Sequence, residues 1–492
     1  MLQIQKILFL AIAAIIWRLL WRLWLHPLSK FPGPTLAAIS NLSYFKWSIS
    51  GELHSKIQEL HDCYGDVVRI RPNALTYRDA QAWSDIYGHR KAGKPSCTKD
   101  PEFYIQSSSG SAANLINSND VDHARQKRLL THAFSDRSLR DQEPLIMGYI
   151  DTFISRLGDT ASRHADDEPV DMLRWLNFLT FDIIGDLAFG ESFGCLEGSE
   201  YHPWVETTFK SIKTGAVLRA FSIYPSLAIL IRKLMPKKLI RKRVDHYKFS
   251  KDLVNKRLAT STSRPDFLFY VLRYNDERGM QTAEIQSNAA LLIQAGSETT
   301  ATTLGACLFY LKKRPECYQA LVKEVRAAFG SEAEITASNV SRLPYLNAVI
   351  EEGLRMYPPA PAIGPRVIPP GGAVVCGQYL PQGTSVSVAH YSTFRGLSNF
   401  AEPNSFHPER WLKSNNDPRF KNDKKEALQP FSFGPRACIG RNLAYAEMRL
   451  VLSKMLWNFD ISLDPQSHHW DKSKSYIVWE NQPLWVHLRQ AV

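Results

Sequence analysis

The sequence has no Gly/Ser-rich linker, no internal repeat and no low-complexity tract that would divide its 492 residues. A chain of this length can hold two or three average domains, yet large enzymes also reach it as one compact body. The missing linkers favour the second arrangement. We therefore expect one catalytic domain over residues 31–492, preceded by a separate N-terminal segment over residues 1–30.

Paired cysteines are missing too. The seven cysteines are odd in number, widely scattered and form no C-x-x-C pair. This pattern argues against a disulfide framework and against the usual zinc-site spacing. We expect reduced thiols facing the cytosol, and apart from Cys438 we interpret them as small buried apolar residues.

Nucleic-acid motifs are absent, although the formal net charge is +12. No zinc-finger spacing, RNA-binding signature or extended basic tail accompanies this charge, so we expect no nucleic-acid partner. An acidic protein or an anionic membrane surface suits the charge better. A dinucleotide fingerprint is missing as well, because no G-x-G-x-x-G opens a helix after a strand.

An apolar run lies near the N-terminus, from Ile7 to Trp17, and continues to Leu25 with interruptions at Arg18 and Arg22. No small-residue cleavage site follows it, and its tryptophans and arginines suit a membrane interface. We expect an uncleaved anchor with the arginines on the cytosolic side. The alternative is an amphipathic helix that lies on the bilayer. The Phe31-Pro32-Gly33-Pro34 segment then predicts a stiff hinge.

The stretch from Phe431 to Gly440 organises the rest of the chain. It brings Cys438 to the start of a helix, where backbone amides and the nearby Arg436 favour a thiolate. Gly434 and Gly440 lack a Cβ atom, so the backbone there could lie flat against a planar partner. A thiolate beside a planar partner indicates haem iron, and the alternative is an inert buried cysteine.

These residues resemble the haem-ligand signature of the cytochrome P-450 monooxygenases. The match rests on Phe431, Gly434, Arg436, Cys438 and Gly440. The resemblance implies a mainly α fold with a small β-rich part, and haem b held between a long central helix and the cysteine loop. It makes Cys438 the axial ligand of the haem iron. The phrases around His123, residues 364–370 and His407 are most similar to fungal microsomal enzymes of the isotrichodermin C-15 hydroxylase group.

A long helix is expected from about Thr282 to the stop at Pro315. Small and hydroxyl-bearing residues share one face of it, which by itself would indicate a small-residue helix crossing. The segment from Ala295 to Thr300, however, resembles the oxygen-activation motif of the family. The resemblance implies that Gly296 permits a local opening, that Thr299 hydrogen-bonds the oxygen molecule, and that Glu298 connects to a proton-carrying water chain.

Two further sets of residues take their roles from the resemblance. The family usually binds the haem propionates with a Trp-x-x-x-Arg pair, for which this sequence has His123 and Lys127, and with a third donor that corresponds to Arg366. For Lys127 a solvated basic face is the alternative. The second set, a buried carboxylate with two arginines, is structural and consists of Glu352, Arg355 and Arg410.

Other segments have coarser interpretations. Residues 67–77 predict two short strands around a turn, and residues 92–120 form a long loop that in the family covers the substrate pocket. Residues 223–257 predict a second, shallow membrane contact, with an ordinary charged helix as the alternative. A hairpin near Ile477 and Val478 is implied to line the pocket.

The implied reaction inserts one oxygen atom of O2 into an apolar small molecule, by hydroxylation or epoxidation. Electrons would come from NADPH through a separate flavoprotein reductase, because the chain has no dinucleotide fingerprint of its own. The expected location is the endoplasmic reticulum membrane, with the catalytic domain in the cytosol. The alternatives are a haem-thiolate isomerase or dehydratase, and a non-enzymatic haem sensor or carrier. The Glu298-Thr299 pair argues against both.

Overall fold

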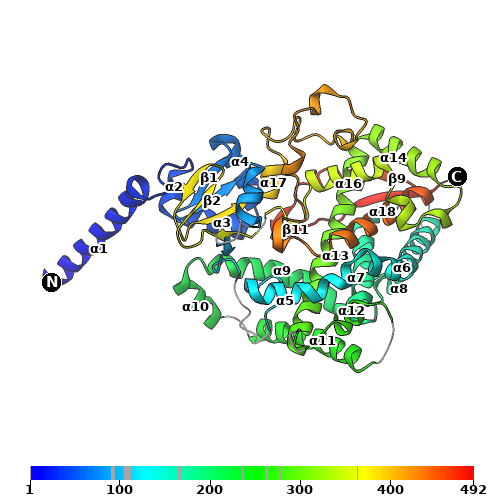
Figure 1. Ribbon diagram of the computed structural model, residues 1–492, viewed down its shortest axis with the longest axis horizontal. Coiled ribbons are helices and arrows are strands. Elements are labelled where there is room, and N and C mark those ends of the chain that lie inside the picture. The colour runs from blue at the N-terminus through cyan, green and yellow to red at the C-terminus, as the bar shows by residue number, and fades with distance from the viewer. Residues whose placement is uncertain are drawn as a thin grey trace.

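A mainly helical body and a smaller β-rich part lie side by side, and one helix projects from the β-rich end (Figure 1). The computed structural model describes the chain except for residues 1, 90–94, 105–111, 164–167, 235–236, 261–263, 277–278, 363 and 492. For residues 2, 163, 208–210, 232, 237–243 and 246 only the backbone is described. The expected fold class is confirmed.

The helical body is built around α13 (Thr282–Lys313). The helix begins with a reciprocal capping box between Gln281 and Glu284, one residue before the expected Thr282, and it ends just before Pro315. Most of its side chains are buried, because α7 (Met172–Phe189), which is apolar on nearly every side, packs along it. This pair of helices forms the centre of the main core.

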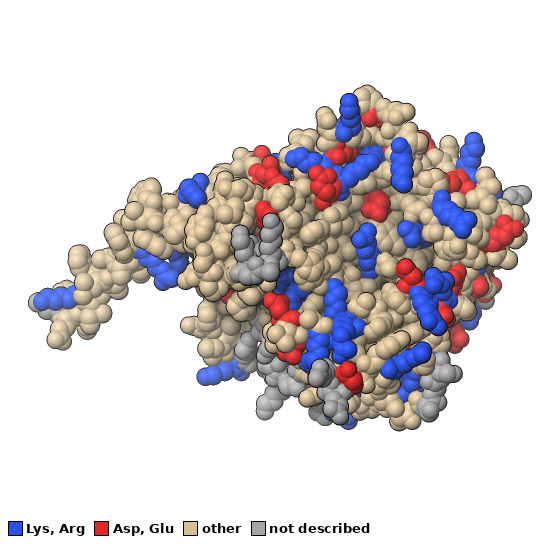
Figure 2. Space-filling model, in the orientation of Figure 1, with Lys and Arg blue, Asp and Glu red and all other residues tan. Residues whose placement is uncertain are grey.

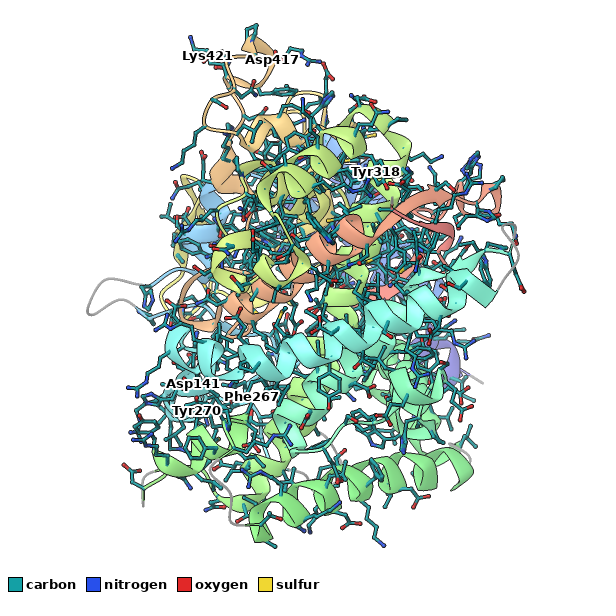
Figure 3. The ribbon with its side chains drawn as sticks, turned by 90° about the vertical axis from the view of Figure 1, so that its right-hand side faces the viewer. Asp141, Phe267, Tyr270, Tyr318, Asp417 and Lys421 are labelled. Atoms are coloured by element: carbon teal, nitrogen blue, oxygen red, sulfur yellow. The ribbon has the colours of Figure 1, made fainter. Side chains whose placement is uncertain are left out.

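Further helices enclose this pair. Several of them contribute buried side chains to the main core, namely α5 (Asp120–Leu130), α6 (Asp136–Arg163), α12 (Phe267–Arg273), α14 (Pro315–Ala328), α16 (Pro344–Met356) and α18 (Arg441–Asn458). Figure 3 shows Asp141 of α6 next to Tyr270 of α12, whose hydroxyl donates to it at 2.8 Å. Such contacts hold the helices in place around the candidate active site.

The remaining helices lie toward the β-rich part or on the outside. They are α2 (Thr35–Ile39), α3 (Leu42–Ser50), α4 (Leu53–Tyr64), α8 (Cys195–Gly198), α9 (Pro203–Phe221), α10 (Pro225–Leu234), α11 (Lys237–Ala259), α15 (Ala337–Val340) and α17 (His390–Phe394). Among them α9 spans from the β-rich part toward the helical body, above α5 (Figure 1).

The largest sheet has five strands in the order β1 (Val67–Arg71), β2 (Ala74–Tyr77), β8 (Ser385–Val388), β5 (Arg366–Val367) and β3 (Thr98–Lys99). Only the β2–β8 pair is parallel. The expected hairpin over residues 67–77 is confirmed as β1 and β2. The far edge matters for the site, because Lys99 of β3 pairs directly with Arg366 of β5.

Three small sheets complete the described part. One joins β6 (Ala373–Val375) to β7 (Gln378–Leu380), and a second joins β10 (Lys474–Tyr476) to β11 (Val478–Glu480). The third has the order β4 (Val170–Asp171), β12 (Trp485–Gln490) and β9 (Phe459–Leu463). Ile477 forms the turn between β10 and β11, so the expected hairpin is present.

The projecting arm consists of α1 (Leu2–Leu20) and a π-helical turn, Trp21–Leu25. Residues Gln3–Leu25 have a mean hydropathy of 1.9 and are unburied, so they are long and apolar enough to cross a membrane. Figure 2 shows this arm as mostly uncharged. The arm therefore has the length and composition of a membrane anchor.

The proline segment after the arm is not a free hinge. Arg69 of β1 donates its backbone N–H to Pro32 O at 2.8 Å, and a Cβ on Gly33 would clash with the Arg69 carbonyl oxygen. Leu28 and Phe31 are buried in the core of the β-rich part. The expected hinge is stiff because it is attached to the sheet, and the attachment extends back to Arg22, whose backbone oxygen accepts from Arg69 Nη1 at 3.0 Å.

Candidate active site

The cysteine loop is closed by its own backbone. Cys438 N donates to Phe431 O at 2.8 Å, and the Phe431 ring packs 5.2 Å from the ring of Tyr445. Gly434 has φ of +74°, and a Cβ there would clash with the Tyr87 carbonyl oxygen. Gly434 therefore serves the packing of the loop. By contrast, a Cβ on Gly440 would come no nearer than 3.9 Å to the Cys438 sulfur, so the loop is open there.

The Cys438 thiol is surrounded by protein but still borders open space, which places its sulfur on an internal cavity. Burial raises the pKa of the thiol, against the smaller effects of the Gly440 amide and Lys127. The expectation of a lowered pKa is therefore wrong for the protein alone. The helix α18 begins only at Arg441, and the Arg436 guanidinium is paired with Asp120 at 2.6 Å, so neither offsets the loss of hydration.

One face of α13 borders open space. Ala295 is exposed and Thr299 is partly exposed, although their neighbours Ser297, Glu298 and Thr300 are buried. The Thr299 hydroxyl donates to Ala295 O at 2.6 Å. The small residues on this face leave room for a ligand beside Thr299.

The helix is continuous at Gly296, so the expected local opening is not present in this structure. A Cβ on Gly296 would lie 2.8 Å from Ile184 Cδ1 of α7. Gly296 thus lets α7 approach α13 closely, which is the small-residue crossing that the sequence pattern alone favoured. The fit of the two helices explains why a glycine is needed here even without an opening.

Glu298 lies next to this face and is 8% exposed. Burial raises the pKa of its carboxyl group to about 8. No described side chain or backbone N–H donates a hydrogen bond to that carboxyl group. A group with this pKa holds a proton near neutral pH and can release it to water.

A group of cationic side chains lies beside the loop, and among the described residues only Arg436 of this group has an acidic partner, Asp120. Arg366 and Arg436 each have a buried Nη1 with no hydrogen-bond partner in the described part of the chain. Burial and the charges of Arg436, Lys99 and Lys127 lower the pKa of His123 to about 3. Buried guanidinium donors without acceptors are costly, so this arrangement calls for an anionic ligand.

Lys99 belongs to the same group, and the sequence did not reveal it. Its Nζ donates to Leu115 O at 3.1 Å and to Ile116 O. Burial, followed by the charges of Arg436 and Arg366, lowers its pKa to about 6. The strand that carries Lys99 has only two residues, so the pairing with Arg366 that places it here leaves no pattern in the sequence.

Comparisons with known proteins show the family of the chain. The sequence model described as cytochrome P450 matches residues 32–487. The chain belongs to the cytochrome P450 family. It is 63% identical over 473 residues to the cytochrome P450 monooxygenase astJ of Aspergillus oryzae, which covers 96% of this chain and 94% of that protein.

Other relatives have more specific names. The trichothecene C-15 hydroxylase of Fusarium sporotrichioides is 41% identical, with 95% of this chain and 94% of that protein covered. The averantin hydroxylase of Dothistroma septosporum is 39% identical, with 97% and 90% covered. This P450 is therefore a haem-dependent monooxygenase that uses O2, a redox partner and a small-molecule substrate.

The residues of this P450 fit a haem. The Cys438 sulfur and the Ala295–Thr299 face both border internal space, and Arg366 and Arg436 each offer a buried Nη1 donor, without a described acceptor, for carboxylates. Lys127 differs from its expected role, since its Nζ donates to Pro435 O at 2.6 Å and to Ala437 O at 3.3 Å. In this structure Lys127 holds the cysteine loop against α5.

The predicted structural set lies together in the core of the P450. Arg355 makes two hydrogen bonds to Glu352, at 2.7 and 2.8 Å, and Arg410 Nε lies 3.2 Å from Glu352 Oε1. All three side chains are 0% exposed. Burial alone would raise the pKa of Glu352, but Arg355 and Arg410 hold it below its usual range. Asp423 also pairs with Arg410, which the sequence did not indicate.

Proposed function

We propose that this P450 hydroxylates or epoxidises an apolar small molecule in fungal secondary metabolism, with electrons from NADPH through a separate flavoprotein reductase. The observation that carries the proposal is a cysteine that borders internal space beside two guanidinium groups, each with a buried Nη1 that has no described acceptor. The relatives support the hydroxylase chemistry, since two of them are named for it. The absence of a dinucleotide fingerprint supports a separate reductase.

Each residue of the site has a proposed task toward the haem. Cys438 is the axial ligand, and Arg366, Arg436, His123 and Lys99 surround the propionates. The remaining residues shape the surroundings: Phe431, Gly434, Gly440 and Lys127 set the form of the loop, and Gly296 sets the spacing of α13. When bound, the haem supplies the redox chemistry for cleaving O2, which thiolate ligation promotes.

Proton delivery is the proposed task of Thr299 and Glu298. The Thr299 hydroxyl borders the internal space, so it can hydrogen-bond both to Ala295 O and to water or ligand on its other side. Glu298 lies one residue away and holds a proton at neutral pH. The pair can move a proton from the carboxyl group toward the open face of α13.

Membrane attachment is proposed through residues 1–30, with residues 31–492 in the cytosol at the surface of the endoplasmic reticulum. The exposed apolar side chains of α10, namely Ile229, Leu230 and Leu234, support a second shallow contact. The basic side chains expected beside it, at positions 237–243, lie outside the described residues.

The test starts from a fungal strain that lacks the gene, because such a strain accumulates the substrate. Its extract is incubated with the purified protein, a fungal NADPH-dependent reductase and oxygen-18 gas. We expect a metabolite that carries one labelled oxygen atom and forms only with NADPH and reductase. A product without label, or one formed without reductase, would show an isomerase or dehydratase instead.

A further inference from the structure

Arg219 in the last turn of α9 is a cation without an acidic partner. Its guanidinium group lies 4.5 Å from the centroid of the Phe103 ring, and it makes no hydrogen bond or ion pair with any described residue. Burial lowers the pKa of the guanidinium group. No described residue therefore supplies an anionic partner for Arg219, and an anion from outside the protein can take that place.

Two tyrosine hydroxyls without partners accompany Arg219. Tyr44 of α3 and Tyr104 make no side-chain hydrogen bonds within the described chain. Burial raises the pKa of both phenols, and the charge of Arg219 lowers each of them, so the three groups lie within electrostatic reach. All three side chains are partly exposed, so a ligand can reach them.

The nearby carboxylates of Asp100 and Glu102 already have other hydrogen-bond or ion-pair partners. Asp100 accepts a hydrogen bond from the Ser385 hydroxyl at 2.6 Å, and Glu102 pairs with Arg71 at 2.5 Å. The favourable dipole at the end of α9 and the Phe103 ring compensate part of the burial of Arg219. Neither of them accepts a hydrogen bond from its N–H groups in the plane of the guanidinium. That plane is the usual docking geometry for a carboxylate.

This cluster of three donors lies next to the cationic group beside the cysteine loop. Ser222, just after α9, donates to Glu102 O at 3.3 Å, which ties the helix end to the segment before Tyr104. On its other side the Tyr104 ring lies 5.7 Å from the Arg366 guanidinium. The cluster thus stands between the outer helix α9 and the donor group beside the cysteine loop.

We propose that the substrate of this P450 carries an anionic oxygen, a carboxylate or an acidic phenol, which Arg219 binds while Tyr44 and Tyr104 donate to its remaining lone pairs. The apolar part of the substrate then extends toward α13. This inference rests on the proposed function, because it assigns the substrate class of the same pocket.

The experiment measures binding by the shift of the haem absorption band, with full-length holoenzyme in non-ionic detergent free of phospholipid. The probes are dodecanoate and abietate, each compared with its methyl ester. We expect at least one acid to bind about tenfold more tightly than its ester, which is about 1.4 kcal/mol. Arg219→Gln removes this preference, and Arg219→Lys retains part of it.

Lys213→Gln is the matched control. Lys213 lies on the same helix, and its charge is paired with Glu480 at 2.5 Å, so its loss leaves the preference for the acid intact. The proposal is overturned if neither acid binds more tightly than its ester, or if Arg219→Gln keeps the preference. It is also overturned if Arg219→Gln releases haem, since Arg219 then belongs to the propionate donors. These outcomes need no turnover, so they are independent of the reductase assay.

Discussion

We expect Thr299 to influence whether the electrons from NADPH form product or hydrogen peroxide. Thr299→Ala removes the hydroxyl that borders the internal space but keeps the helix backbone. We expect electrons to leave more often as hydrogen peroxide, with product per NADPH reduced roughly tenfold, or about 1.4 kcal/mol in the partition. Product, peroxide and NADPH are measured together. Thr299→Ser, which keeps a hydroxyl, is the control, and unchanged coupling in the alanine variant would leave Thr299 a packing residue.

Glu298 gives the same route a pH dependence. Because burial raises its pKa to about 8, the carboxyl group is protonated at neutral pH and loses its proton as pH rises through about 8. We expect product per NADPH to fall over that range in the wild type. In Glu298→Gln the coupling is lower and does not vary with pH. The measurement is coupling from pH 6.5 to 9.5, roughly one and a half pH units on either side of that pKa.

Glu447 of α18 provides the control for this profile. Burial raises its pKa to about 8 as well, but it contacts Thr300 on the buried side of α13. Glu447→Gln is expected to keep the fall in coupling. If it abolishes the fall and Glu298→Gln does not, the proton role belongs to Glu447.

At the level of single residues, the sequence predicted what lies within one short motif. Cys438, Arg436 and Thr299 stand in such motifs, and each lies at the candidate site, while their roles remain predictions. The positions of Lys99 and Arg219 were not predicted. They depend on a two-residue strand pairing and on the approach of α9 to a distant loop. The pKa of Cys438 was mispredicted, because a local argument from helix amides does not include burial by the rest of the fold.

The contact of α13 with α16 is tight enough to test at the level of elements. A Cβ on Gly353 of α16 would clash with the Cys307 sulfur of α13. We expect Gly353→Ala to lower the free energy of unfolding by about 1–3 kcal/mol, as overpacking does. Cys307→Ala in the same chain should restore most of it, because the new methyl group takes the place of the sulfur.

Urea midpoints of the holoenzyme provide the measurement. Gly148→Ala in α6 is the control, because no atom lies within 4 Å of its added Cβ, and a helical alanine there gains roughly 0.5–1 kcal/mol over glycine. If the double variant is no more stable than Gly353→Ala alone, the two helices are not in contact through this pair.

Elements with strong periodicity or clear stops were predictable. The helix α13, the helix α16 and the β1–β2 hairpin all lie close to their expected ranges. The continuity of α13 at Gly296 could not be predicted, because a glycine in a helix is compatible with both a local opening of the helix and a close helix crossing. The side chain of Ile184, far away in the sequence, decides between them in this structure.

At the scale of the whole molecule, the attachment to membranes is shared between two regions in this account. Deleting residues 2–20 removes only the exposed helix α1 and keeps Arg22, which accepts from Arg69, and the buried Leu28. We expect the truncated protein to be released from membranes only in part. Glutamate at Ile229, Leu230 and Leu234 in addition should release the rest. Complete release by the truncation alone, measured by membrane sedimentation, would show α10 to be an ordinary surface helix.

The overall architecture followed from the resemblance and not from composition. Periodicity indicated helices and a few strands, but their order around α13 depends on contacts between distant segments, such as Lys99 with Arg366 and Arg410 with Glu352. The same contacts build the site. The chain must therefore be folded as one body before Cys438 has its surroundings.

The central claim is that Cys438 binds haem iron as a thiolate in this P450. The most direct measurement is the absorption spectrum of the reduced, CO-bound protein, with total haem determined separately. We expect the long-wavelength Soret band of thiolate haem in the wild type and its loss in Cys438→Ser, even where haem is retained. If Cys438→Ser shows the same band at equal haem content, Cys438 is not the thiolate ligand.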